Sequence, residues 1–200
     1  MSHHSDEDKR NALLQAAREL FLKNTYSNIS IRRIAKKAGV NSALIAYYFD
    51  SKGGLFREMI KSYITENLNL LRQSVNYVDR MALRDFMKQF YRTMPPEMIH
   101  LTIRTLLFER GELRDWLIES LLNPIFGTGT VVSATIVDHS GKAIDPQVLR
   151  TSIQSMLVFP KLIQPILEMM TPDEVNTEYY DRLAEFQADM ISQYFGLEEN

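Results

Sequence analysis

Apolar residues recur at helical spacing along most of the chain. In the first stretch they stand three or four residues apart, which predicts an amphipathic helix over 7–23. The same periodicity predicts further helices over 31–37, 42–48, 52–76, 79–93, 96–110, 113–136, 145–168 and 172–195. Alternating apolar and polar residues are scarce, and TVVSATIV at 130–137 is the one strand candidate. We therefore predict an all-α protein: an N-terminal three-helix bundle followed by a larger helical domain.

Capping and helix-breaking residues support several of these boundaries. Ser30 is a suitable N-cap for the helix over 31–37, and Gly39 stands where a left-handed residue ends a helix. Ser51 can cap the long helix over 52–76. Pro160 and Pro165 lack a backbone N–H, so we expect them to kink or split the helix over 145–168.

Two short helices separated by a turn that contains Gly39 are typical of a helix-turn-helix. The first helix, 31–37, carries four cations and no acid, and the second, 42–48, begins with small residues. A helix of this kind can enter the major groove of DNA while cations contact the phosphates. For any single residue a solvated cation or a core aromatic is the simpler explanation. The combination of cations, turn, small residues and aromatics favours DNA binding.

Each part of this segment has an expected role. Val40, Ile45 and Phe49 can anchor the core. Ala43 and Leu44 can touch thymine methyl groups, and nearby Asn41 and Ser42 can donate hydrogen bonds to base edges or phosphate. The tyrosines at 47 and 48, with Lys52 and the Ser30 cap, can contact phosphate. The predicted DNA contacts are Ser30, Arg32, Arg33, Lys36, Asn41, Ser42, Ala43, Leu44, Ala46, Tyr47, Tyr48 and Lys52.

The distribution of charge agrees with an anionic partner for the N-terminal part. Residues 1–60 contain ten lysines and arginines against six acids, a net charge of +4, whereas residues 61–200 carry −6. The total of −2 hides this asymmetry. A basic end joined to an acidic body indicates that the partner is local to the first end.

The segment AARELF followed by SIRRIAKKAGVNSALIAYYFDSKGGLF resembles the TetR family of transcriptional regulators, over roughly residues 10–60. The resemblance implies an all-helical homodimer with an operator-binding domain over 7–52. It also implies a domain over 53–200 that dimerises and usually binds a small-molecule effector. By position, Arg32 matches a residue that often reads a base. The recognition surface is matched by Ser42, Ala43, Leu44 and Ala46, and the phosphate-contacting end by Tyr47, Tyr48 and Lys52. Many relatives carry Tyr or Asn where this chain has Ala46.

The C-terminal part carries no motif that can be transferred at residue level. Its aromatic and methionine residues can form an adaptable pocket or plain core. As lining residues we select Phe90, Phe108, Trp116 and Phe159, with Arg104 as an anchor for an anionic ligand. Arg104 can equally pair with Glu109 or Asp115 at the surface. The resemblance implies a homodimer interface built from the helices over 145–168 and 172–195, although packing within one subunit explains their apolar stripes as well.

Several functional classes lose support from the sequence. The chain has no cysteine, which excludes disulfides, thiolate metal sites and cysteine nucleophiles. GTGT at 127–130 begins like a phosphate-binding glycine motif, but Val132 stands where the third glycine should be. We expect no catalytic site, no cofactor and no metal. The polar N-terminus shows no signal peptide, and Pro124, Gly127 and Gly129 interrupt the most apolar stretch, so we expect a cytoplasmic protein without a membrane partner.

The favoured hypothesis is a ligand-responsive homodimeric repressor that a small molecule releases from a palindromic operator. One alternative is a dimeric DNA-binding protein without a ligand. Another is a small-molecule-binding protein or an enzyme whose basic patch binds a different anion.

Overall fold

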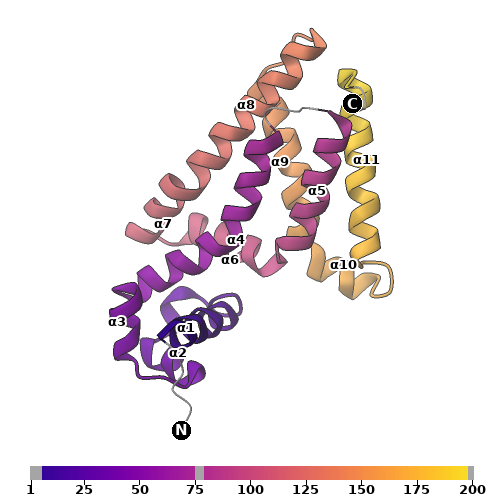
Figure 1. Ribbon diagram of the computed structural model, residues 1–200. Coiled ribbons are helices and arrows are strands. Elements are labelled where there is room, and N and C mark those ends of the chain that lie inside the picture. Colours follow the sequence, from indigo (N-terminus) through magenta and orange to yellow (C-terminus); the bar gives the residue numbers. More distant parts are fainter. Residues whose placement is uncertain (1–5, 75–78, 198–200) are drawn as a thin grey trace. The chain divides into compact units, whose positions relative to one another are not determined.

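The computed structural model describes residues 6–74 and 79–197, and their regular elements are all helical (Figure 1). The prediction of an all-α protein is confirmed. The chain divides into two compact units, Met1–Ile64 and Thr65–Asn200, which we describe separately.

The N-terminal unit is a small helical bundle. It contains α1 (Asp6–Phe21), a short 3₁₀ helix (Tyr26–Asn28), α2 (Ile31–Ala38), α3 (Ala43–Phe49) and the first part of α4 (Lys52–Ser74). Its core side chains are the apolar residues that the helical spacing selects, with Phe21 and Phe56 meeting edge to face at 4.9 Å between ring centroids. Fully or almost fully buried in this unit are Leu13, Ala17, Phe21, Ile29, Ile34, Ile45, Leu55, Phe56, Met59 and Ile60.

Helix α4 belongs in part to this bundle. Leu55, Phe56, Met59 and Ile60 are fully buried, so the compact unit extends to Ile64, beyond the predicted domain boundary at residue 52. The composition changes near residue 52, but the apolar face of the helix continues to contribute to the N-terminal core. The predicted end of this helix at residue 76 lies outside the described residues.

A tight corner joins α3 to α4. Asp50 has a positive φ of 63°, and the N–H of Ser51 donates to the carbonyl of Phe49 at 2.7 Å, which forms a three-residue γ-turn. Ser51 then caps α4 as predicted, since its Oγ accepts from the N–H of Gly54 at 3.0 Å. A Cβ at Gly54 would lie 1.8 Å from the Phe49 carbonyl oxygen, so this corner closes only around a glycine.

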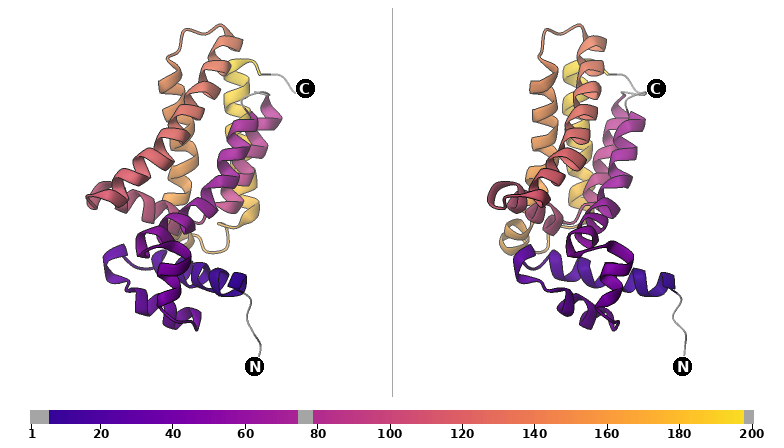
Figure 2. Two further views of the ribbon diagram at one scale, coloured as in Figure 1. Left: turned by 60° about the vertical axis from the view of Figure 1, so that its left-hand side comes forward. Right: turned by 90° about the vertical axis from the view of Figure 1, so that its left-hand side faces the viewer.

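The C-terminal unit is a bundle of longer helices. They are α5 (Arg80–Thr93), α6 (Pro96–Phe108), α7 (Glu112–Leu117), a π-helical turn (Ile118–Leu122), α8 (Asn123–Ser140), α9 (Pro146–Leu162), α10 (Gln164–Met170) and α11 (Thr177–Phe195). Helix α5 packs along α11 and α8 packs along α9, as both figures show (Figures 1 and 2). Their core includes Met87, Tyr91, Ile136, Leu157, Tyr180, Ala184, Ala188 and Ile191.

Ion pairs connect α5 with α11. Arg80 pairs with Asp189 and Glu185, Lys88 pairs with Glu185, and Arg92 pairs with Asp181 at 2.7 Å. Arg84, between them, lies 3.9 Å from Glu185, so the cations recur every four residues, as the carboxylates do, and each set lies along one face of its helix.

The strand candidate at 130–137 is wrong, because these residues form part of α8. Its buried residues, Val132, Ser133, Ile136 and Val137, follow helical spacing. Among the described residues, one helical run, Glu112–Ser140, is long and apolar enough to span a bilayer by length and composition. Because α8 packs along α9, we assign this run to the bundle.

The helix predicted over 113–136 is confirmed as part of a continuous helical run from Glu112 to Ser140. Gly127 and Gly129 lie inside α8, and Pro124 is accommodated near the start of that helix. The preceding turn widens, so that the N–H of Asn123 donates to the carbonyl of Ile118, five residues back. The wider turn relieves the clash that a proline ring makes with the carbonyl four residues before it.

Proline also divides the helix predicted over 145–168, as expected. Helix α9 ends at Leu162, just after Pro160, and Pro165 stands in the first turn of α10. Pro160 has no N–H for the carbonyl of Met156, which instead accepts hydrogen bonds from the Tyr91 hydroxyl at 2.9 Å and Gln187 Nε2 at 3.1 Å.

The final helix starts later than predicted. We expected it to begin at residue 172, but α11 starts at Thr177. Its N-cap is Asn176, whose Oδ1 accepts from the N–H of Tyr179 at 3.0 Å. Asparagine is among the most favourable N-cap residues, so its side chain sets the start of the helix.

Candidate nucleic-acid interface

Helix α2 is defined at both ends by the residues that the sequence selected. Ser30 Oγ accepts from the N–H of Arg33 at 3.2 Å, and Gly39 has a φ of 68°. The buried side of the helix is formed by Ile34 and Ala35. The opposite side is therefore turned outward and carries its charges.

The cations of α2 are not equivalent. Lys37 forms an ion pair with Glu19 of α1 at 2.6 Å, and this contact lowers the pKa of the Glu19 carboxyl. Arg32, Arg33 and Lys36 are exposed, and within the described part of the chain none of them forms an ion pair. Three positive charges on this helix are thus available to an external anion.

Helix α3 begins one residue later than predicted, at Ala43. Asn41 supplies the cap, because its Oδ1 accepts from the N–H of Ala43 at 2.8 Å, whereas Ser42 makes no capping bond. Ile45 and Phe49 are buried as predicted, and Val40 is half-buried. Because Ile45 and Phe49 fix the buried face of α3, the helical period fixes which residues lie on its exposed face.

That exposed face consists of Ala43, Ala46 and Tyr47, with Leu44 and Ser42 half-buried beside it. Tyr47 is 72% exposed and its ring meets that of Tyr48 edge to face at 4.8 Å. The predicted recognition surface is thus presented to solvent. Direct contact of these residues with DNA remains a prediction.

Tyr48 and Lys52, which the sequence selected as phosphate contacts, are both partly buried and interact within the N-terminal unit. Tyr48 is half-buried with its hydroxyl oxygen out of solvent, and burial raises the pKa of that hydroxyl, as does Asp6 at the start of α1. The Lys52 ammonium donates to the carbonyls of Tyr26 and Ile29, both at 3.0 Å, and lies 4.0 Å from the centre of the Tyr26 ring. Lys52 thereby holds the short 3₁₀ helix against the start of α4.

Burial lowers the pKa of the Lys52 ammonium. The Tyr26 and Ile29 carbonyls could not have been assigned to it from the sequence, because they lie more than twenty residues before it. The sequence showed a lysine beside the predicted motif. It gave no signal of an internal partner.

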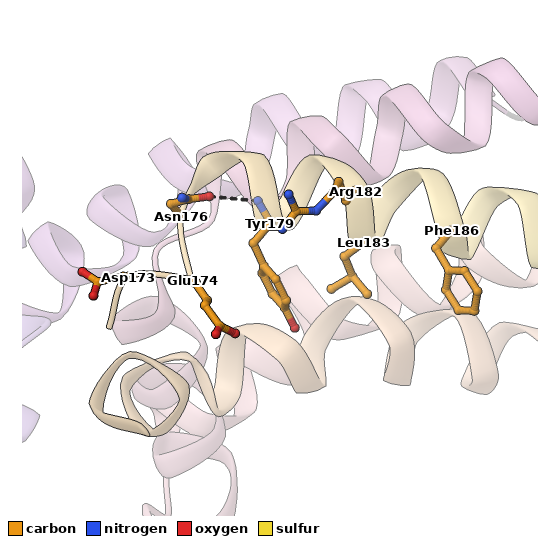
Figure 3. A pocket seen from close by; sticks show the side chains of 7 residues that line it. All are labelled: Asp173, Glu174, Asn176, Tyr179, Arg182, Leu183 and Phe186. Atoms are coloured by element: carbon orange, nitrogen blue, oxygen red, sulfur yellow. Dashed lines mark hydrogen bonds between the residues drawn. The ribbon is translucent and has the colours of Figure 1, made fainter. Parts of the chain in front are cut away.

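The residues selected for an effector pocket do not meet in the pocket that the structure describes. Phe90, Arg104 and Trp116 are half-buried, whereas Phe108 and Phe159 are 79% and 57% exposed. The described pocket is an open groove of about 560 Å³ lined by Asp173, Glu174, Asn176, Tyr179, Arg182, Leu183 and Phe186. The side chains of Tyr179, Leu183 and Phe186 point to the same side of α11 (Figure 3).

The fold and the exposed α2–α3 surface define a class of protein: a helix-turn-helix domain joined to a helical C-terminal unit. Residues 13–59 match the family described as bacterial regulatory proteins, tetR family. Over this segment the sequence is similar to the TetR family, and its helix-turn-helix motif agrees with the match.

Individual relatives agree with this assignment. The HTH-type transcriptional regulator YttP of Bacillus subtilis (strain 168) is 31% identical over 85 residues, which are 42% of this chain and 40% of YttP. The match thus spans less than half of the length of that curated relative.

Two solved structures share the fold. A transcriptional regulator from Pseudomonas aeruginosa PAO1 superposes with a TM-score of 0.71 at 16% identity, over 97% of this chain and 95% of that one. HlyIIR, a hemolysin II transcriptional regulator, gives 0.63 at 22% identity, over 91% and 98% of the two chains.

Proposed function

We propose that this protein is a homodimeric transcriptional repressor that binds a palindromic operator and responds to a small molecule. The observation that carries the DNA-binding part is the outward face of α2 and α3. There, three cations that form no ion pair with any other described residue lie beside a short helix that exposes Ala43, Ala46 and Tyr47. In this proposal the protein is a regulator rather than an enzyme, and it acts in the cytoplasm, where its DNA is.

The proposed binding mode follows from the arrangement within the N-terminal unit. Helix α3 enters the major groove, and Arg32, Arg33 and Lys36 of α2 contact the backbone or base edges nearby. The N-terminus of α2 adds backbone N–H groups and a helix dipole that favour a phosphate. Two copies related by a twofold axis would read two half-sites one helical turn apart or a multiple of it.

A homodimer is supported by the apolar side chains that α11 leaves uncovered. Phe186 is 65% exposed and Tyr194 is 56% exposed, and Met190 lies between them in the helical order. Phe159 of α9 is also exposed, and the described groove lies along α11. Single subunits rarely expose such apolar residues together, so we propose that a second copy covers them.

The continuous helix α4 supports the proposed response to an effector. This helix runs from Lys52 to Ser74, so its residues belong to both compact units. A ligand that binds one tilt of α4 more tightly shifts the population toward that tilt and changes the separation of the two α3 helices. A dimeric DNA-binding protein without an effector would lack this response.

The DNA-binding proposal can be tested with the double variant Arg32→Ala and Lys36→Ala. Footprinting on the DNA around its own gene locates the operator, and titrations at several salt concentrations then give the affinity and its salt slope. Removing two phosphate contacts should lower the affinity and flatten the slope by about two.

A matched control removes the same charge from the C-terminal unit, through Arg110→Ala and Lys142→Ala, two exposed residues. We expect the control to retain the slope of the parent protein. Equal slopes for both double variants would show that α2 does not contact DNA. Absence of any protected palindrome at low and moderate salt would contradict operator binding altogether.

Native mass spectrometry of the purified protein addresses the remaining parts together. A dimer mass with an additional small-molecule mass supports the homodimer and the effector. A dimer without added mass, even after incubation with cell extract metabolites, favours the alternative without an effector. A monomer at micromolar concentration contradicts the dimer.

A further inference from the structure

The face that α3 presents to solvent is almost devoid of hydrogen-bonding groups. The helix comprises ALIAYYF, so its only polar side-chain atoms are two tyrosine hydroxyls. The Tyr48 hydroxyl oxygen is buried, which leaves that of Tyr47. The remaining exposed or half-exposed side chains are the methyl groups of Ala43 and Ala46 and the isobutyl group of Leu44.

The residues just before α3 add few hydrogen-bonding groups to this face. The Oδ1 of Asn41 already accepts from the N–H of Ala43 at 2.8 Å, so its carboxamide is held in the cap of the helix. A bidentate contact with adenine needs both the oxygen and the nitrogen of the amide turned toward the base, whereas the cap turns the oxygen toward the backbone of Ala43. Ser42 is half-buried. Hydrogen bonding to bases by α3 and the two residues before it is therefore restricted to the Asn41 amide nitrogen and the hydroxyls of Ser42 and Tyr47.

In the major groove only one base presents an apolar group, the C5-methyl of thymine. Alanine and leucine side chains on the exposed face of α3 bury that methyl group and their own apolar surface, which favours binding. The same side chains over a guanine would remove water from its N7 and O6 acceptors without replacing the hydrogen bonds, which is unfavourable. A small apolar surface therefore both favours thymine and disfavours guanine.

From this surface we propose that α3 recognises thymine methyl groups, so that each operator half-site carries thymines facing Ala43, Leu44 and Ala46. The inference rests on the proposed DNA-binding function and names the chemistry by which it becomes sequence-specific. The cations of α2 supply most of the affinity through the backbone, and the methyl contacts supply the preference between bases at the positions under α3.

The test replaces thymine with uracil, which removes the methyl group and leaves the base pair and its hydrogen-bonding edges unchanged. Preferred sequences are first selected from a random DNA pool with the full-length protein. Each thymine of a half-site is then replaced by deoxyuridine in turn, and the affinity is measured. At the positions under α3 we expect a loss of about fourfold for each methyl, the value for burying one such group.

A second arm places 5-methylcytosine or cytosine, each paired with guanine, at the same positions. The methylated base should bind more tightly than cytosine, because it restores the apolar group. The variant Ala46→Gly provides the matching change in the protein. Its ratio of affinities for thymine and uracil should fall toward one at the position under Ala46, and since both DNAs meet the same protein, any loss of folded protein cancels in the ratio.

The outcomes separate this inference from the proposal on which it rests. If a preferred sequence is found and every uracil substitution leaves the affinity unchanged, methyl recognition is wrong while operator binding stands. If the selection yields no preferred sequence, sequence-specific operator binding itself is wrong. Losses confined to positions outside the contact of α3 would likewise overturn the assignment to this helix.

Discussion

Gly54 is required where α4 approaches the end of α3. Its Cα faces the carbonyl of Phe49, and an added Cβ would lie 1.8 Å from that oxygen. Neighbouring Gly53 has room, since its nearest atoms would be side-chain oxygens of Ser51 and Tyr26, both at 3.5 Å. The two glycines are adjacent in one helix, yet only one is needed for packing.

This contrast gives a prediction with an internal control. Gly54→Ala forces the backbone of the corner apart and should destabilise the protein by about 1–3 kcal/mol, the usual range for overpacking. Gly53→Ala should stabilise it by about 0.5–1 kcal/mol, because alanine loses less backbone entropy in a helix. Urea unfolding followed by circular dichroism measures both. Similar effects of the two substitutions would show that the close approach at Gly54 is absent in solution.

Helices α5 and α11 are joined by a network of charges in which Glu185 is central. Its carboxylate contacts Arg80 at 3.3 Å, Arg84 at 3.9 Å and Lys88. A single carboxylate that is partly shielded from water and shared by several cations contributes more than an isolated surface pair. Glu178 of the same helix, by contrast, pairs only locally with Arg182 among the ion pairs described.

The network leads to a prediction at the level of these two helices. Glu185→Gln should lower the free energy of unfolding by about 1 kcal/mol at low salt, and by less at high salt because ions screen the charges. Glu178→Gln removes an exposed pair four residues apart and should cost no more than about 0.5 kcal/mol. Thermal or urea unfolding at two salt concentrations makes the comparison. A Glu185 effect that does not depend on salt would argue against an electrostatic origin.

The break between α9 and α10 could be predicted from its prolines, but the hydrogen bonds made there could not. Pro160 and Pro165 indicated a division of the helix over 145–168, since neither can donate a backbone hydrogen bond. The sequence could not show that the carbonyl released by Pro160 would accept from Tyr91 and Gln187. Those partners belong to α5 and α11, and only the packing of the helices brings them to α9.

For the whole molecule the central prediction concerns the exposed face of α11. Phe186→Glu places a charge in the proposed interface between two copies, where its desolvation is unfavourable. We expect a shift from dimer to monomer and a large loss of operator affinity, because one half-site alone binds weakly. Sedimentation velocity and DNA titration measure the two effects.

Leu107→Glu is the matched control, since Leu107 of α6 is 69% exposed and lies outside the two helices assigned to the interface. It should leave the dimer intact. If the Phe186→Glu variant remains a dimer, the assignment of the interface to this part of α11 is wrong.

The recognition motif was predictable because its signals are local. A cap at Ser30, a left-handed glycine at 39 and buried Ile45 and Phe49 depend on residues within one or two turns of each other. The roles assigned to Lys52 and Tyr48 depended on what lies opposite them. The Lys52 ammonium donates to the carbonyls of Tyr26 and Ile29, and the Tyr48 hydroxyl oxygen is buried; no local pattern encodes either environment.

The sequence by itself determined the helical architecture, most helix ends and the outward placement of Arg32, Arg33 and Lys36, because helical periodicity and capping act over a few residues. Only the tertiary structure decided which of the cations are internally paired, that Gly54 must be a glycine, and that Phe108 and Phe159 lie at the surface of the subunit. These features depend on distances between segments remote in the chain, and such distances are set by the packing of whole helices.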